Sequence, residues 1–404
     1  MSAVDCEACV GDGSRIERIV HPGDPFVASE RADREQALAS RDDPQRLEYF
    51  ADREVLAPDG TFPNGEGFLY SEPQPTAPEA GIAPPSGTPG SLALAGHRGT
   101  KRVQQDAGGL LELSVGGNSA AILVTADGVS ASRGLAHRAS QTAVQTFLRQ
   151  VEVELADPPD DEASRHAFVE LALERAAVVA NFEVVRQVLL DLDRDGAYTA
   201  PDAAQLSGAG FELPNEPLTV EDMERLAPGL QRAVDYLAAQ GVTAQTTFSA
   251  AVAVDNDLYT FNSGDSVVSL FRAHSAQGHR MIHLTERDQS VVELFKLADD
   301  TYRSYPNVFQ NMITDSMGDS ATLTGIIRRY PDVLRPGDRV LSSTDGIGPR
   351  RDGSAGLDRE AVERILATAP SARAAADELV RRQLDGLDAG EYQDNIAVVV
   401  LDVR

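Results

Sequence analysis

The feature that most constrains this chain is an apolar run that ends in an Asp-Gly pair. Residues 121 to 127 read Ala-Ile-Leu-Val-Thr-Ala-Asp, and Gly128 follows. An unbroken run of small and β-branched apolar residues predicts a buried strand. Glycine after it allows a sharp turn, or lets the backbone carbonyl approach a bound ion. Asp127 is therefore predicted at the rim of a sheet, either as an ordinary turn residue or as a carboxylate aimed at a ligand.

Other aspartates stand beside predicted strands far away in the chain. Asp345 and Asp394 flank strands, Asp106 precedes one, and Asp265 lies in a Gly-Asp-Ser sequence that we expect to close a hairpin. Folding alone seldom places acids at so many sheet rims. Hard divalent cations such as Mg²⁺ or Mn²⁺ bind several carboxylates plus water, and two ions about 3.5–4 Å apart can share one bridging carboxylate. The pattern favours such a centre.

Other kinds of catalytic site lack their sequence signatures. No histidine pair has the spacing of a zinc protease, and neither a G-x-S-x-G nor a P-loop motif is present. Cys6 and Cys9 form one C-x-x-C, with no second Cys/His pair at zinc-ribbon spacing. Ligands that are all oxygen favour Mg²⁺ or Mn²⁺ over zinc.

The charge balance limits the partners of this chain. The formal net charge is −27, from 36 Lys+Arg against 63 Asp+Glu, which argues against nucleic acid or an anionic membrane as a partner. An anionic substrate would need local positive charge from arginine or from bound cations. We find no secretory leader pattern and no apolar run near 18 residues, so we expect a soluble, cytoplasmic protein. The sequence gives no indication of its oligomeric state.

The chain divides at about residue 90. Residues 1–90 are acidic, and 73–89 have the Pro/Gly/Ala-rich composition of a linker, which predicts a mostly disordered N-terminal arm. Residues 91–404 are predicted to form one domain with an acidic insertion at about 191–225.

Hydrophobic periodicity predicts the elements of this domain. Residues 286–335 are expected to be irregular with helical pieces, whereas 245–284 should form an antiparallel meander. Thr219 with Asp222 indicates a capped helix start, and Ser371 should cap a later helix. Further strands are expected over 92–95, 110–115, 120–125, 339–343 and 396–403, and helices over 135–153, 163–192, 229–240, 359–369 and 372–387.

Part of the insertion resembles an EF-hand calcium loop. The twelfth position of this match is aspartate rather than the longer glutamate, the eighth is tyrosine, and no second EF-hand is present. The segment is either a calcium-binding loop or an acidic surface turn. Its candidate Ca²⁺ ligands, at positions 1, 3, 5 and 12, are Asp191, Asp193, Asp195 and Asp202.

Seven segments, in chain order, resemble the metal-dependent serine/threonine protein phosphatases, the type 2C or PPM family. The resemblance covers residues 91 to 404, and it implies an α+β fold. This fold is a four-layer α-β-β-α sandwich of two packed, mainly antiparallel sheets with flanking helices. The matching segments are Arg102-Val-Gln-Gln-Asp106-Ala, Thr125-Ala-Asp127-Gly128-Val, Thr246-Thr247-Phe-Ser-Ala, Asn262-Ser-Gly264-Asp265-Ser266, Leu284-Thr285-Glu-Arg-Asp288, Ser343-Thr-Asp345-Gly346 and Asp394-Asn395-Ile-Ala-Val.

The resemblance implies a metal-ligand set. Asp127 would bridge two Mg²⁺ or Mn²⁺ ions, with the Gly128 carbonyl helping to hold one of them. Asp345 and Asp394 would hold the second ion, and Asp265 would contribute to a weaker third site. In such a centre a hydroxide bridging the metals attacks phosphorus in line. The resemblance implies that the substrates are proteins carrying phosphoserine or phosphothreonine.

The resemblance also implies catalytic residues. Asp106 would position metal-bound water. The arginine that binds phosphate in the family usually precedes this aspartate by five residues, where this chain has Lys101. We favour the neighbouring Arg102, because a guanidinium binds phosphate with two parallel hydrogen bonds, with Lys101 or Arg98 as alternatives.

The chain departs from the family after the first Asp-Gly pair. Many relatives carry Gly-Gly or histidine there, whereas this chain has Val129-Ser-Ala-Ser132. No histidine general acid is therefore expected at that place. His97 and His137 are candidates for this role only by proximity in the sequence, and we favour the interpretation that both are surface histidines. The alternative to an active enzyme is an inactive phosphatase-like fold that acts as a binding or regulatory module.

Overall fold

The structure is a computed structural model of the chain. It describes residues 15–16, 69–71, 89–97, 105–129, 136–159, 161–194, 220–239, 243, 245–273, 280–285, 313, 316–321, 323, 325–348, 356–385 and 393–404. Among the helices in these ranges, none has both the length and the apolar character needed to span a bilayer.

Two sheets form the centre of the molecule. One has seven strands in the order β1-β10-β7-β6-β5-β4-β2, and the other has five in the order β3-β12-β11-β8-β9. All neighbouring strands are antiparallel except β2 and β4. The bounds are β1 Arg15–Ile16, β2 Leu69–Ser71, β3 Pro89–His97, β4 Asp106–Val115, β5 Asn118–Asp127, β6 Phe248–Val254, β7 Asp257–Ser263, β8 Val267–Arg272, β9 Arg280–His283, β10 Gly325–Tyr330, β11 Arg339–Ser343 and β12 Ile396–Val403.

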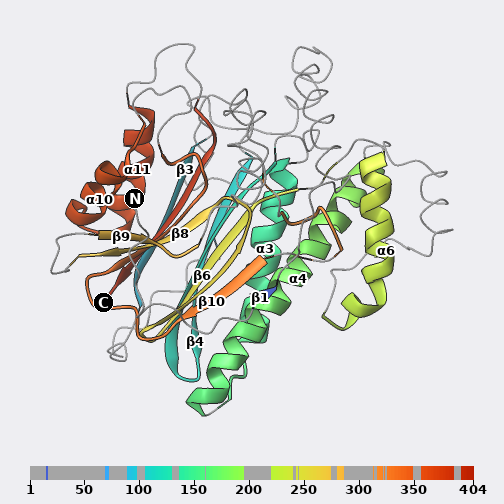
Figure 1. Ribbon diagram of the computed structural model, residues 1–404, viewed down its shortest axis with the longest axis horizontal. Coiled ribbons are helices and arrows are strands. Elements are labelled where there is room, and N and C mark those ends of the chain that lie inside the picture. The colour runs from blue at the N-terminus through green and yellow to red at the C-terminus, as the bar shows by residue number, and fades with distance from the viewer. Residues whose placement is uncertain are drawn as a thin grey trace, which may run out of the picture.

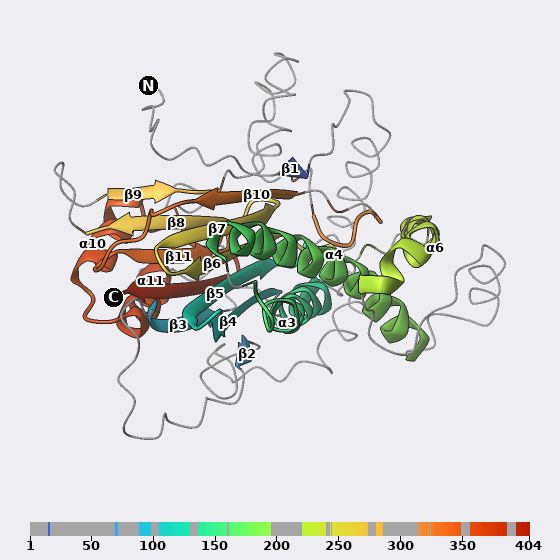
Figure 2. The ribbon, with the colours of Figure 1, turned by 90° about the horizontal axis from the view of Figure 1, so that it is seen from below.

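Helices cover the outer face of each sheet. Figure 1 shows α10 and α11 on the outer side of the five-stranded sheet, and α3 and α4 on the far side of the other sheet. Figure 2 shows α6 beyond α4, away from the sheets. The bounds are α3 Ala136–Glu154, α4 Glu162–Arg194, α6 Val220–Ala239, α10 Arg359–Thr368 and α11 Ala372–Leu384. The predicted four-layer α-β-β-α sandwich is confirmed.

Alternation along the strands assigns each buried side chain to one layer. In β5, Ile122 and Val124 pack with the helices, whereas Ala121 and Leu123 pack between the two sheets. Strand β12 does the same, since Val398 and Val400 pack with α10 and α11 whereas Val399 and Leu401 pack between the two sheets. Because both faces of these central strands are buried, the strands read as continuous apolar runs rather than as alternating ones.

The predicted meander over 245–284 is wrong. Strands β6 and β7 pair, and so do β8 and β9, but β7 and β8 belong to different sheets. The second edge of β7 pairs instead with β10, which lies inside the segment predicted to be irregular. Residues 264–266 therefore carry the chain from one sheet to the other rather than closing a hairpin.

Helix α6 is one helix where the sequence predicted a capped start and then a second helix over 229–240. It runs through Pro228, although proline in a helix interior removes one hydrogen bond and crowds the preceding turn. The buried side chains Leu230, Ala233 and Leu237 join the cluster that α3 and α4 form with the sheet. Tertiary packing thus outweighs the local preference of the sequence.

Two predictions fall mostly outside the described residues. Within the N-terminal arm only β1, β2 and the start of β3 are described, each paired with a sheet strand, so the arm's disorder stays a prediction. Helix α4 continues through Arg194, and the first four positions of the predicted calcium loop are helical. Residues 195–219 are outside the described part of the chain, and calcium binding stays a prediction.

A partly buried polar cluster lies where β7 begins. Asp257 accepts hydrogen bonds from Arg329 Nε and Nη2 at 3.0 and 2.8 Å, and from the backbone N–H of Asp332 at 2.8 Å. His166 of α4 contacts the Tyr259 hydroxyl at 2.6 Å. Burial, reinforced by Asp257, raises the pKa of Tyr259 well above its ordinary value. This cluster stabilises the end of the sheet at which β7 starts.

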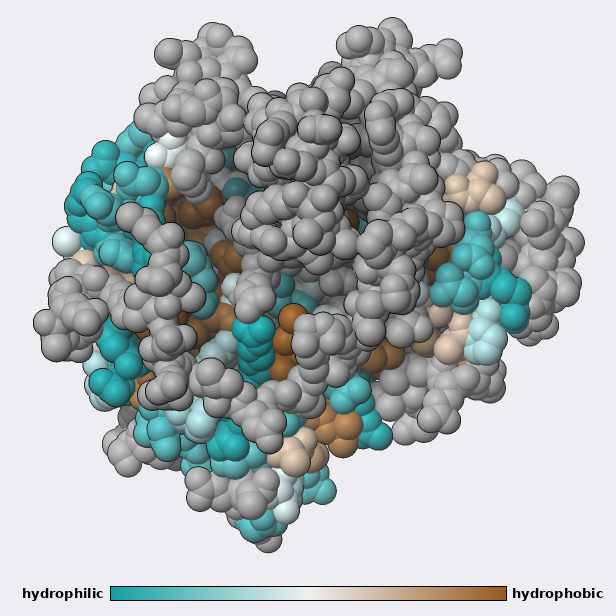
Figure 3. Space-filling model, in the orientation of Figure 1, coloured by the Kyte–Doolittle hydropathy of each residue, from teal (hydrophilic) through white to brown (hydrophobic). Residues whose placement is uncertain are grey.

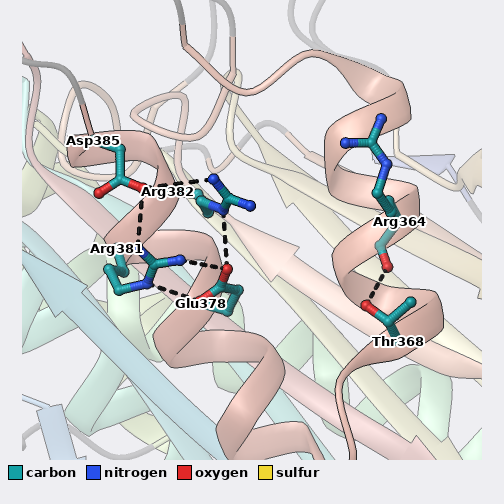
Figure 4. Close-up of polar contacts among 6 residues, drawn as sticks. All are labelled: Arg364, Thr368, Glu378, Arg381, Arg382 and Asp385. Atoms are coloured by element: carbon teal, nitrogen blue, oxygen red, sulfur yellow. Dashed lines mark hydrogen bonds and ion pairs between the residues drawn. The ribbon is translucent and has the colours of Figure 1, made fainter.

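The outer face of α11 is charged. Glu378 accepts hydrogen bonds from Arg381 and Arg382, and Asp385 accepts one from Arg381 (Figure 4). The hydrogen bond from Arg381 lowers the pKa of Glu378. In the view of Figure 3 the described surface over α10 and α11 is mostly hydrophilic. Exposed ion pairs contribute at most about 1 kcal/mol each to the stability of the fold. The apolar side chains on the buried face of α11 therefore hold this helix against the sheet.

Candidate metal centre

Two carboxylates face each other where β4 begins and β5 ends. Asp106 lies directly opposite Asp127 in the antiparallel register. Residues in such a pair have Cα atoms about 4.5–5.5 Å apart and point to the same face of the sheet. Asp106 is only 1% exposed. Like charges directly opposite each other are destabilising, so this pair favours a bound cation.

Hydrogen bonds on both sides hold the backbone of the Asp127-Gly128 pair. The Asp127 N–H donates to Thr247 Oγ1 at 3.0 Å, and the Asp127 carbonyl accepts from the Thr247 N–H at 2.8 Å and from Thr246 Oγ1 at 2.9 Å. On the other side, the Gly128 N–H donates to the Gln105 carbonyl at 3.1 Å. Sheet-like pairing thus continues past the end of β5, and this fixes the direction of the carboxylate.

Glycine is required at position 128 by close packing. A Cβ atom there would lie 2.3 Å from the Ala136 carbonyl oxygen and 2.8 Å from that of Gln105. Gly128 therefore sits against the first residue of α3. The Ser140 hydroxyl of the same helix donates to the Gln105 carbonyl at 2.5 Å, which ties α3 to the start of β4.

In the five-stranded sheet, two acidic segments lie beside each other, namely Asp345-Gly346 and Asp394-Asn395. Asp345 follows β11 and Asp394 precedes β12, and these two strands are antiparallel neighbours. Pairing continues to Thr344, whose N–H donates to the Ala397 carbonyl at 3.1 Å. A Cβ atom on Gly346 would lie 1.8 Å from the Asn395 carbonyl oxygen. Only glycine lets the two segments approach this closely.

Polar side chains join the two sheets at this end. Thr344 Oγ1 donates to Asp106 Oδ2 at 2.6 Å, and the Gln105 N–H donates to Asn395 Oδ1 at 2.9 Å. One layer deeper, the hydroxyls of Thr125 and Ser342 lie 2.8 Å apart. Farther from this end, apolar side chains of both sheets pack against one another. Asp106, Asp127, Asp345 and Asp394 therefore gather at one end of the sandwich.

Asp265 lies at the same end of the sandwich. It belongs to the crossover between β7 and β8, and Ser263 at the end of β7 pairs with Phe248 at the start of β6. The hydroxyl of Ser266 lies 2.7 Å from Thr247 Oγ1, and Thr247 is the residue that binds Asp127. The structure therefore brings all five sequence-predicted aspartates to one region.

The chemistry of the donors fits Mg²⁺ or Mn²⁺. Carboxylate and carbonyl oxygens are the ligands that these ions prefer, and no histidine or cysteine is needed. Within the described residues, however, no group of three or more His, Cys, Asp or Glu side chains lies in a metal-holding arrangement.

The predicted phosphate-binding cations lie outside the described residues. Arg102, Lys101 and Arg98 all fall in the range 98–104, which is not described. His97 ends β3 opposite Ile396 and so stands near Asp394. His137 lies in the first turn of α3 and is buried, so its interpretation as a surface histidine is wrong.

The structure adds supporting residues that the sequence did not single out. These are the polar groups that bind the acidic segments, namely Thr247, Thr344, Asn395 and two glutamines described below. Thr247, Thr344 and Asn395 lie inside segments that resemble the family, but the sequence assigned them no role of their own. Gln383 lies in a predicted helix, and Gln393 directly precedes the segment that begins at Asp394.

A sequence model of the family described as protein phosphatase 2C matches residues 95–387. No curated protein sequence matches the chain.

Several solved structures resemble the chain. The PPM Ser-Thr phosphatase MsPP from Mycobacterium smegmatis is 19% identical with a TM-score of 0.45, over 78% of this chain and 100% of that one. PstP/Ppp from Mycobacterium tuberculosis is 18% identical with a TM-score of 0.46, over 78% and 99%. Stp1 from Staphylococcus aureus is 14% identical with a TM-score of 0.49, over 80% and 99%.

The family assignment rests on the sequence model, which covers well over half of the chain. The two packed sheets with flanking helices agree with it, and so does the meeting of the acidic strand ends. This chain belongs to the protein phosphatase 2C family.

Proposed function

We propose that this chain hydrolyses phosphoserine and phosphothreonine in proteins at a centre of two Mg²⁺ or Mn²⁺ ions. The observation that carries the proposal is the placement of Asp106 opposite Asp127, at the end of the sandwich where Asp345 and Asp394 also meet. Family membership supports phosphatase activity, and the oxygen donors support the choice of metal.

Each aspartate has a part in this proposal. Asp127 would bridge the two ions, assisted by the Gly128 carbonyl, while Asp345 and Asp394 would hold the second ion. Asp265 would contribute to a weaker third site. When bound, the ions would neutralise the charge of the phosphoryl group and lower the pKa of a water molecule.

The protein itself would orient the reactants. Asp106, held by the hydrogen bond from Thr344 at 2.6 Å, would orient the attacking water. Arg102 would bind the phosphoryl oxygens and hold phosphorus in line with that water. With a net charge of −27, bound cations and such an arginine are what would let an anionic substrate approach. We further propose a cytoplasmic location.

Metal removal tests the proposal. Purified protein should release phosphate from a phosphothreonine peptide in the presence of Mn²⁺, and excess EDTA should reduce the rate to background. Adding back Mn²⁺ beyond the EDTA should restore the rate, because the ligands themselves are unchanged. A colorimetric phosphate assay measures all three states.

The alternative of an inactive, partner-binding fold predicts a different result. Well-folded protein with no Mn²⁺-dependent release from phosphoserine or phosphothreonine peptides would favour that alternative. Release that continues undiminished in EDTA would instead contradict the metal-dependent mechanism.

A further inference from the structure

Two buried glutamines connect α11 to the acidic segments of the five-stranded sheet. Gln383 lies on the buried face of α11 and is 1% exposed, and Gln393, directly before Asp394, is 3% exposed. Gln383 Nε2 donates to Gln393 Oε1 at 3.0 Å. We call this pair the glutamine relay. Its burial matters, since a buried amide that loses a hydrogen-bond partner cannot replace it with bulk water.

The surrounding backbone fixes the direction of the relay. Gln383 Oε1 accepts from the Leu357 N–H at 3.1 Å and from the Gly348 N–H at 3.3 Å, so this atom must be the amide oxygen. Its Nε2 then faces the Gly348 carbonyl at 3.0 Å as well as Gln393. Because Gln393 accepts through its oxygen, its own Nε2 must point away from Gln383.

The donor end of the relay reaches both acidic segments. Gln393 Nε2 donates to the Gly346 carbonyl at 3.0 Å and to the Asp394 carbonyl at 3.3 Å. Gly346 follows Asp345, so one amide group binds the backbone beside each of the two acids. This is also the place where Gly346 packs against Asn395. A shift of the relay would therefore change the spacing of the two carboxylates.

We propose that Gln383 and Gln393 are positioning residues for the metal centre. They hold the backbones of Asp345 and Asp394 beside each other, at the end of the sandwich where both acids would bind one divalent cation. The inference rests on the proposed function and deepens it, because it assigns a role to residues that would touch neither metal nor substrate. Groups that orient metal ligands in this way typically change metal affinity by about 10- to 100-fold when removed.

A purely structural role would give a different pattern. If the relay only anchored α11, its loss would lower the melting temperature without weakening metal binding beyond what any similar destabilisation does. Arg329→Met is the matched control, because it breaks the polar cluster around Asp257. This cluster lies at the start of β7, whereas the acidic segments lie near Ser263 at the other end of that strand.

The experiment uses the full chain and three methionine variants. Methionine is close to glutamine in length but donates no hydrogen bond. Isothermal titration with Mn²⁺ measures the dissociation constant for wild type, Gln383→Met, Gln393→Met and Arg329→Met, and calorimetric melting in EDTA measures their stability. We expect the dissociation constant for Mn²⁺ to rise by about 10-fold or more in both glutamine variants. In Arg329→Met it should equal the wild-type value.

Other outcomes overturn the inference. Wild-type Mn²⁺ affinity in both glutamine variants would do so, and so would equal weakening in all three. If the methionine variants do not fold, Gln383→Glu replaces them. It keeps an acceptor for the Leu357 and Gly348 N–H groups but loses both donated bonds, so it should weaken Mn²⁺ binding too, and unchanged affinity would contradict the relay. Wild-type protein that binds no Mn²⁺ would instead refute the proposed metal centre itself.

Discussion

Replacing Asp127 with asparagine should lower Mn²⁺-dependent phosphate release by about a thousandfold or more. The substitution keeps the shape of the side chain and the backbone hydrogen bonds with Thr247, but it removes the charge that would bridge the two ions. Loss of several kcal/mol of transition-state stabilisation corresponds to a rate change of this size. Steady-state kinetics on a phosphothreonine peptide measures the effect.

Stability measurements separate this loss from misfolding. In EDTA, Asp127→Asn should melt at or above the wild-type temperature, because it relieves the repulsion with Asp106. Mn²⁺ should raise the melting temperature of wild type much more than that of the variant. Asp377→Asn, on the exposed face of α11, is the control and should keep full activity. An Asp127→Asn variant with wild-type activity would show that the bridging role is wrong.

Gly346→Ala should both destabilise the protein and abolish metal-dependent activity. The new Cβ atom would lie 1.8 Å from the Asn395 carbonyl oxygen, so one backbone segment must move. Overpacking of this kind typically costs about 1–3 kcal/mol, and a clash with rigid backbone lies at the upper end of that range. Because the moving segments carry Asp345 and Asp394, we expect Mn²⁺ affinity to fall as well. Denaturant unfolding and calorimetric titration measure the two effects.

Gly117→Asn is the matched control for this substitution. Gly117 has a φ of 82° in the turn between β4 and β5, and a Cβ atom there would meet nothing within 4 Å. Asparagine tolerates this backbone region better than other side chains, so the variant should lose less than about 1 kcal/mol and no activity. Wild-type stability and metal affinity in Gly346→Ala would contradict the packing that joins the two acidic segments.

Local signals in the sequence predicted most of the individual strands and helices, whereas the four-layer arrangement was implied by the family resemblance. The strands expected over 339–343 and 396–403 coincide with β11 and β12, because their apolar runs end in clear turn and Asp signals. The N-cap at Ser371 is confirmed by its hydrogen bond with the Ala374 N–H. Strand β10 was not predicted, because Gly-Ile-Ile-Arg-Arg-Tyr has little alternation. Without β10, the sequence did not show that the second edge of β7 pairs with a strand other than β8.

In the candidate site too, local signals identify individual residues but not the contacts between distant segments. Asp-Gly pairs at the ends of apolar runs are local, and they pointed to Asp127 and Asp345 directly. The bond from Gln105 to Asn395 joins residues 290 positions apart, and no local pattern encodes such a contact. The glutamine relay was equally invisible, since Gln383 occupies a helix position that looks like any other polar residue.

Anomalous scattering from Mn²⁺ in crystals of the chain tests the central claim most directly. The account predicts two anomalous peaks about 3.5–4 Å apart, with Asp127 bound to both and with Asp345 and Asp394 bound to one of them, at metal–oxygen distances of about 2 Å. Fully occupied Mn²⁺ peaks elsewhere, with none at the end of the sandwich where these aspartates meet, would contradict it.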